Sequence, residues 1–182
     1  GGVEVAPPPH PEFTMRRRSA TKLLRQVEQW HGTLARESYV EKSIWSPCEV
    51  IRGWEIELPV EGLGPVRWVV QELLGSWELA AEGRAMRHCV VSYTPQCVEG
   101  HTSIWSIQAR TETEPPQGVL TVAIDNQERA ITQARGRYNA VPQSRNWSKK
   151  QQNTGKGYLQ LLDASSQVLR QWQERECLGR LN

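Results

Sequence analysis

Three strand-like runs follow one another in the middle of the chain: SIWSIQAR at residues 103–110, VLTVAI at 119–124 and RAITQAR at 129–135. Each run is short and rich in β-branched or aromatic residues, which is typical of strands. The segment 125–128, Asp-Asn-Gln-Glu, favours a tight turn between the last two runs, and the Pro-Pro-Gln-Gly segment at 115–118 favours a longer loop between the first two. Short connections join neighbouring antiparallel strands, so the pattern predicts an antiparallel meander of at least three strands.

Two more strands and two short helices are predicted ahead of the meander. Alternation at 54–58 and the apolar run at 66–70, separated by a Pro- and Gly-containing turn, predict a hairpin. Ser76 is a favourable N-cap for a helix through Glu82, which we expect Gly83 to end. We expect a second short helix to begin within 86–93 and to reach about Glu99.

Helices are also predicted at both ends of the chain. Residues 156–177 carry an apolar stripe that includes Trp172, and residues 19–45 form a predicted helical segment with apolar residues at three-to-four spacing. The Pro-rich linker and the Arg-Arg-Arg arm occupy residues 1–18, which leaves 46–182 as the main domain. The fold class is therefore expected to be α+β, an antiparallel sheet with flanking N- and C-terminal helices.

The composition indicates a protein of the cytoplasm. No apolar run approaches the roughly 20 residues that span a bilayer, so we expect no membrane contact. Hydrophobic residues make up only 38% of the chain, but eight tryptophans allow a modest aromatic core. The spacing of the four cysteines does not suggest a disulfide framework; they are Cys48, Cys89, Cys97 and Cys177.

Positive charge is concentrated near the C-terminal end. Between Arg129 and Leu162 the chain has seven Arg or Lys and no Asp or Glu, a charge of +7, whereas the whole chain has a net charge of +2 and the remainder therefore −5. Such asymmetry indicates an anionic partner.

One motif is more distinctive than the composition. EGRAMRHCVVSY at residues 82–93 is followed by Gly100, by the run at 103–110 and by QARGRYN at 133–139. This order resembles the PcfJ-like family, whose approximate pattern is EG-x-x-M-x-HCV-x-x-Y, a glycine, a strand and Q-x-RG-x-x-N. The resemblance covers about residues 75–147, and Val91 stands where many relatives have glycine.

The resemblance implies a setting rather than a reaction. It implies a protein of conjugative plasmids, phages and other mobile elements, or of defence systems, in which other domains of a longer parent protein are partners. The residues that match the motif are the site candidates: His88, Cys89, Tyr93, Gln133, Arg135, Gly136 and Asn139.

Cysteine and metal chemistry are weaker hypotheses. His88 and Cys89 are adjacent, and on a helix adjacent side chains point about 100° apart, so Cys89 is more plausibly a small core residue than a nucleophile. Only Cys97 and His101 have zinc-like spacing, and both lie outside the motif. We therefore expect neither metal nor cofactor, with Cys97 buried and His101 at the surface.

The segment around residue 135 favours contacts with phosphate. Gln133 and Arg135 share one face of a strand, and Gly136 is expected to end that strand in an unusual turn. A guanidinium beside amides suits phosphate or base contacts. The predicted ligand-binding residues are His88, Gln133, Arg135, Gly136, Arg137 and Asn139, and those expected to contact nucleic acid are Arg135, Arg137, Tyr138, Arg145, Lys149 and Lys150.

Three functions stay open at this point. The leading hypothesis is a nucleic-acid or phosphate-ligand binding domain that uses the basic region 133–156 with His88. The second is an enzyme, with His88 and Tyr93 as catalytic candidates beside Gln133, Arg135 and Asn139; the third is a protein-interaction module. His88 and Arg135 have structural alternatives too, as a histidine bonded to backbone and as a partner of a carboxylate. We expect His88 to lie near the sheet face of Gln133 and Arg135.

Overall fold

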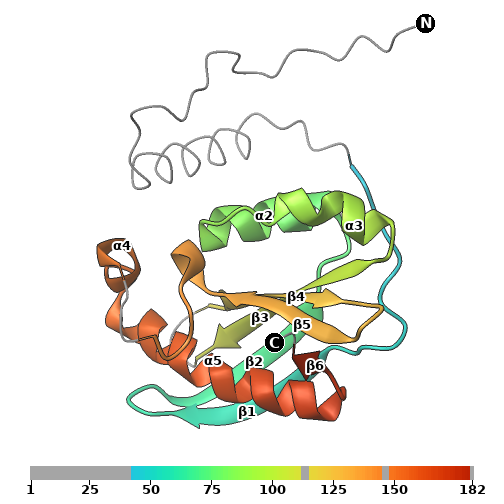
Figure 1. The fold of residues 1–182 in the computed structure, drawn as a ribbon. Helices are drawn as coiled ribbons and strands as arrows, with labels where there is room; N and C mark the ends of the chain where they lie inside the picture. The colour runs from blue at the N-terminus through green and yellow to red at the C-terminus, as the bar shows by residue number, and fades with distance from the viewer. Residues whose placement is uncertain (1–41, 112–114, 145–147, 181–182) are drawn as a thin grey trace, which may run out of the picture.

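The computed structural model describes residues 42–111, 115–144 and 148–180. Five antiparallel strands pair in chain order, and a short sixth strand pairs in parallel with the fifth. They are β1 (Trp54–Val60), β2 (Gly64–Glu72), β3 (Thr102–Arg110), β4 (Gln117–Asp125), β5 (Ala130–Arg135) and β6 (Gly179–Arg180). The predicted meander and hairpin are confirmed, and together they form one sheet (Figure 1).

Helices cover both faces of this sheet, as Figure 1 shows. On one face lie α2 (Ser76–Met86) and α3 (Thr94–Val98), joined through the short 3-10 turn η1 (Val91–Tyr93), and on the other lies α5 (Lys156–Arg175). A second 3-10 turn, η2 (Arg137–Asn139), and α4 (Lys149–Gln152) come between β5 and α5. The α+β prediction is confirmed.

The main core lies between the sheet and α5. Trp172 is fully buried there, and its ring centroid lies 5.0 Å from that of Trp105 on β3. The indole Nε1 of Trp172 donates a hydrogen bond of 2.9 Å to the carbonyl of Arg52, so the polar edge of the ring is also satisfied. The predicted C-terminal helix and its buried tryptophan are thus confirmed.

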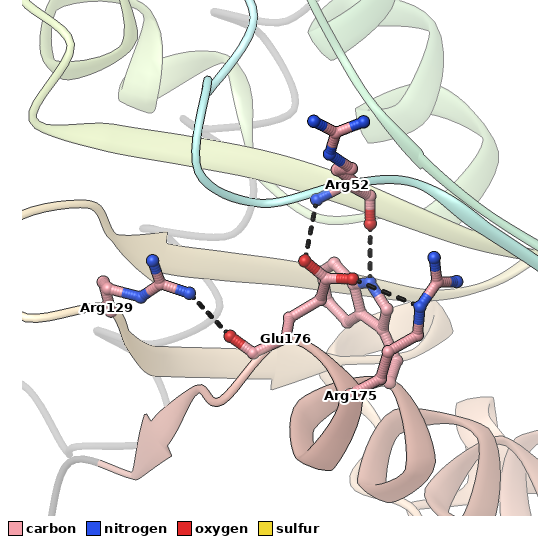
Figure 2. A network of polar contacts seen from close by, with 5 residues as sticks. Arg52, Arg129, Arg175 and Glu176 are labelled. Atoms are coloured by element: carbon pink, nitrogen blue, oxygen red, sulfur yellow. Dashed lines mark hydrogen bonds and ion pairs between the residues drawn. The ribbon is translucent and has the colours of Figure 1, made fainter.

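A polar network closes the C-terminal end of α5 (Figure 2). One carboxylate oxygen of Glu176 accepts from the backbone N–H of Arg52 at 3.1 Å, and the other lies 3.5 Å from Nε of Arg175. The backbone carbonyl of Glu176 accepts from Arg129 at 2.7 Å. One residue therefore ties α5 to the segment before β1 and to the start of β5. This contact occupies Arg129, the first cation of the basic stretch, far from the end of β5.

The predicted helix boundaries near His88 are wrong. Gly83 does not end α2, which continues to Met86 and closes on Arg87 in the left-handed conformation (φ 56°). Ser76 is not the N-cap either, because Gly75 occupies that position. A Cβ on Gly83 would lie 2.9 Å from the backbone oxygen of His88, so this glycine allows the chain after α2 to fold back on the helix.

His88 and Cys89 consequently lie in a loop and not on a helix. The predicted helix from 86–93 to Glu99 is replaced by η1 and the five-residue α3. Of the predicted helical segment 19–45, Ile44 is in an isolated bridge with Gly75 rather than in a helix. The linker and residues 19–41 of that segment lie outside the described residues.

Glu72, at the end of β2, allows a prediction on pH. Its carboxylate accepts a hydrogen bond of 2.9 Å from the N–H of Cys48, and burial raises its pKa to about 7 although that bond lowers it. A carboxyl whose pKa is higher in the folded state stabilises the fold at low pH, and this stability is lost as pH rises through about 7.

Replacing Glu72 with glutamine keeps an acceptor for Cys48 but removes the titration. We expect the variant to gain stability relative to the wild type as pH rises from about 5 to about 8. Urea unfolding at both pH values measures this change. An equal difference between the two proteins at both pH values would show that Glu72 does not titrate in this range.

Candidate functional site

A β-bulge decides which side chains of β5 face α2. The pairing of β4 with β5 shifts between Ala123 and Ile124, so Thr132 is an extra residue on β5. Ile131, before the bulge, and Ala134, after it, both pack on the α5 side of the sheet. In a regular strand two residues three positions apart would point to opposite faces. Gln133 and Arg135 are thereby directed to the opposite face, the one that α2 and α3 cover.

On that face β5 and β4 are in register. Arg135 is opposite Thr121, and Gln133 is opposite Ala123. The next strand continues both rows, with Ser106 beside Thr121 and Ile104 beside Ala123. The row Arg135–Thr121–Ser106 is polar, and the row that begins with Gln133 is otherwise apolar. The loop that carries His88 lies over both rows.

A small hollow lies where these rows meet the loop, with a volume of about 30 Å³. It brings together six of the predicted site residues, although the first and the last are 51 residues apart: His88, Cys89, Tyr93, Gln133, Arg135 and Asn139. Among the described residues, the hollow is lined by His88, Cys89, Val90, Tyr93, Ile104, Thr121, Ala123, Gln133, Arg135 and Asn139. The two halves of the motif thus meet in space.

Glu82 supports His88 from inside the protein. It is a buried residue of α2, and its carboxylate accepts hydrogen bonds from Thr121 at 2.6 Å and from Ser106 at 3.2 Å. The hydroxyl of Thr121 lies 3.0 Å from Nε2 of His88. A carboxyl, a hydroxyl and an imidazole therefore form one chain that runs from the core to the hollow.

The hydrogens in this chain follow from counting donors. A hydroxyl has one hydrogen, and Thr121 donates it to Glu82, so Nε2 of His88 carries a hydrogen and donates to Thr121. Burial lowers the pKa of His88 to about 4, although a hydrogen bond to its own backbone raises it. The imidazole is consequently neutral near pH 7 and is held in one orientation.

Burial has the opposite effect on Glu82. It raises the pKa of this carboxyl, while the hydrogen bonds from Thr121 and Ser106 lower it. If Glu82 carries a proton on the oxygen that faces Thr121, it donates to Thr121, which then donates to Nε2 of a His88 that has given up its Nε2 hydrogen and carries one on Nδ1 instead. The chain can thus pass a proton between the core and the hollow.

Arg135 is the cation of the hollow. Its guanidinium donates one hydrogen bond, to the carbonyl of Ala134 at 3.1 Å. Among the residues that the structure describes, no carboxylate lies within ion-pair distance of it. The pairing with a carboxylate that the sequence left open is therefore not found in this part of the chain.

The expectation for Gly136 needs correction. Its φ is −85°, which any residue can adopt, so the strand does not end in a turn that requires glycine. A Cβ here would instead lie 2.5 Å from Cδ1 of Leu162, 3.0 Å from the hydroxyl of Tyr158 and 3.2 Å from the carbonyl of Val119. Gly136 is a packing residue that lets β5 approach α5.

Arg137 does not line the hollow. Its backbone N–H donates to the hydroxyl of Tyr158 at 2.6 Å, and its guanidinium lies 4.6 Å from the centroid of that ring. Tyr158 in turn donates to the carbonyl of Val119 at 3.0 Å. These contacts hold η2 on α5, and the role of Arg137 as a ligand contact stays a prediction.

The unusual backbone conformation belongs to the next two residues. Tyr138 and Asn139 both have positive φ, 56° and 59°. For tyrosine this conformation is unfavourable and persists only when its surroundings impose it. Here Gly136 bonds to the carbonyl of Ala140 at 2.8 Å and Gln151 bonds to that of Tyr138 at 3.0 Å. The result exposes the Tyr138 ring and places Asn139 at the hollow.

A comparison with protein families finds one match that covers this site. The family model of the PcfJ-like protein matches residues 65–149. This region belongs to the PcfJ-like family. The match extends from β2 to α4 and so includes every residue that lines the hollow. No curated protein and no solved structure matches the chain.

Within the PcfJ-like region, sequence reasoning missed the support of the site. Glu82 opens the motif, yet it was not a candidate, since a single glutamate on a helix is usually solvated. Thr121 was missed because it lies in an apolar strand. The position of Glu82 in the motif could have indicated its role. Nothing in the sequence indicates that Thr121 belongs to the site.

The remaining candidates lie away from the hollow or outside the description. Arg145 is not among the described residues, and Lys149 and Lys150 begin α4, with side chains that are not described. Cys97 is buried as expected, and burial raises its pKa to about 12, while His101 is exposed. Cys89 is half-buried at the hollow rather than in the core.

The described part of the chain contains no cluster of three or more His, Cys, Asp or Glu side chains that could hold a metal ion. In that part there is also no helix with the length and apolar character needed to cross a membrane.

Proposed function

We propose that the PcfJ-like region binds nucleic acid through a phosphate group at the hollow. The observation that supports this most is Arg135, whose guanidinium lies at the rim without a carboxylate partner among the described residues. Gln133 and Asn139 add exposed amides beside it. A planar guanidinium beside amide donors is well suited to phosphate oxygens.

The size of the hollow favours a large ligand that presents a small group. A volume of about 30 Å³ holds about two water molecules and cannot enclose a nucleotide base or a typical metabolite. The greater part of the ligand must therefore lie outside, along the surface of the protein. A nucleic-acid strand satisfies this condition.

Features around the hollow suit such a strand. Tyr138 is 36% exposed on the turn that follows Arg135, and an exposed aromatic residue can stack on a base. The stretch 129–162 adds a charge of +7, which would attract a polyanion. The proposal also includes the cytoplasmic, mobile-element or defence setting that the family suggests.

A comparison of arginine variants tests this function. We expect Arg135→Ala to weaken the binding of a fluorescent single-stranded oligonucleotide by about tenfold or more, because a charge-assisted phosphate contact contributes about 1.5–3 kcal/mol. Arg170→Ala is the matched control, since Arg170 is exposed on α5, on the opposite face of the sheet. Fluorescence anisotropy at fixed salt gives both affinities.

The outcome separates the proposal from its rivals. Equal affinities of the two variants would place the contact elsewhere in the basic stretch. If neither variant nor the wild type binds any oligonucleotide, the protein-interaction hypothesis replaces this one.

An enzymatic function is the second candidate, and the chain Glu82–Thr121–His88 favours it. A neutral imidazole backed by a buried carboxyl can accept or release a proton beside a bound group. Substrate turnover that His88→Gln abolishes while binding persists would identify an enzyme.

A further inference from the structure

The hollow has a closed floor. Val90, Ile104 and Ala123 line it and are at most 4% exposed, so a group that enters cannot continue through to the other side. The polar side chains Arg135, Gln133 and Asn139 lie at the more exposed rim. A group that fills the hollow therefore enters and leaves by the same opening.

The side chains around the hollow are suited to one kind of group. Arginine and the two amides provide several N–H donors, and none of the described residues that line the hollow is an Asp or Glu that would repel an anion. The neighbouring hydroxyl of Thr121 is already engaged by Glu82 and His88. Solvent screens the charge of Arg135 less in a partly apolar pocket than at an open surface. The attraction between Arg135 and a doubly charged anion is therefore stronger than its attraction to a singly charged one.

We propose that this hollow binds the terminal phosphate of a nucleic-acid strand in preference to an internal phosphodiester. The inference rests on the proposed function and specifies its ligand. An internal phosphodiester has one negative charge and presents only two non-bridging oxygens, because both of its ester connections must stay outside the opening. A terminal phosphate has one such connection and carries a charge of about −1.5 to −2 near pH 7.

The geometry also explains the two strained residues. Left-handed conformations at Tyr138 and Asn139 place an amide at the hollow and an aromatic ring outside it. A strand whose end phosphate lies in the hollow would have its first base at the surface, where a ring is available for stacking. One turn of the chain thus provides an amide for the end phosphate and an aromatic ring for the first base.

The experiment compares one oligonucleotide sequence with different ends. Single strands with a 5′-phosphate, with a 3′-phosphate and with hydroxyls at both ends are titrated into the full chain, and anisotropy measures each Kd. We expect one of the phosphorylated strands to bind about tenfold more tightly than the hydroxyl-ended strand, and inorganic phosphate to compete for this difference. The position of the preferred phosphate identifies which end is recognised.

Two variants show whether the hollow is responsible. Asn139→Asp keeps the size of the side chain but adds a negative charge beside the ligand, and it should abolish the preference for the phosphorylated end. Arg135→Lys keeps the charge but loses the planar fork, and it should reduce the preference. Melting temperatures establish that both variants remain folded; if Asn139→Asp does not fold, Asn139→Ala takes its place.

Equal affinity for all three strands, with binding that still depends on Arg135, would overturn this inference and leave the proposed function intact. A preference for phosphate that both variants retain would also overturn it, since the end would then be recognised elsewhere. Absence of binding to every strand would overturn both.

Discussion

Replacement of Trp172 by alanine is expected to lower the free energy of unfolding by about 3–5 kcal/mol. The side chain is fully buried between α5 and the sheet, and it packs against Trp105 at a centroid distance of 5.0 Å. The variant loses this burial, leaves a cavity and frees the carbonyl of Arg52 from its hydrogen bond. Urea unfolding followed by circular dichroism measures the loss.

Trp77→Ala is the matched control because Trp77 is 45% exposed on α2. The same truncation there should cost clearly less, since less apolar area leaves the protein interior. A loss of similar size in both variants, or a loss below about 1 kcal/mol for Trp172→Ala, would contradict the packing of α5 on the sheet.

Gly136→Ala is expected to have the second largest effect on stability. The added Cβ would lie 2.5 Å from Leu162, which is fully buried, and 3.2 Å from the backbone carbonyl of Val119. Neither neighbour can move away at low cost, so we expect a loss near the upper end of the usual 1–3 kcal/mol for overpacking. Thermal unfolding measures this loss.

Gly157→Ala provides the comparison for Gly136→Ala. Gly157 lies in the first turn of α5, and a Cβ there would meet no atom within 4 Å. Alanine is the better helix former, so this variant should be neutral or slightly more stable. If Gly136→Ala is equally harmless, β5 does not approach α5 as closely as described.

The sequence predicted strands better than the ends of helices. Alternating and β-branched residues locate strands directly, and short turns join neighbours, so the order of the sheet followed. The end of α2 was predicted wrongly. Glycine often terminates a helix, but Gly83 allows a close contact with His88 instead, and Arg87 adopts the left-handed conformation that ends the helix. A residue with a side chain in that conformation cannot be anticipated from local preference.

Only part of the site could be predicted from the sequence. The motif indicated that His88 and Arg135 belong together, and both line the hollow. The face of the sheet on which Arg135 lies depends on the bulge at Thr132, which reverses the alternation of β5 and is not visible in the sequence. Gly136 and Arg137 share the segment with Arg135 but serve packing, which follows only from the position of α5.

The salt dependence of binding tests the central proposal most directly. The logarithm of Kd for a single-stranded oligonucleotide is plotted against the logarithm of salt concentration for the wild type, Arg135→Ala and Arg170→Ala. Each phosphate contact contributes about 0.7 to the slope for single strands. We expect the slope of Arg135→Ala to be smaller than that of the wild type by about this amount, with Arg170→Ala unchanged. Identical slopes for all three proteins would contradict a phosphate contact at Arg135.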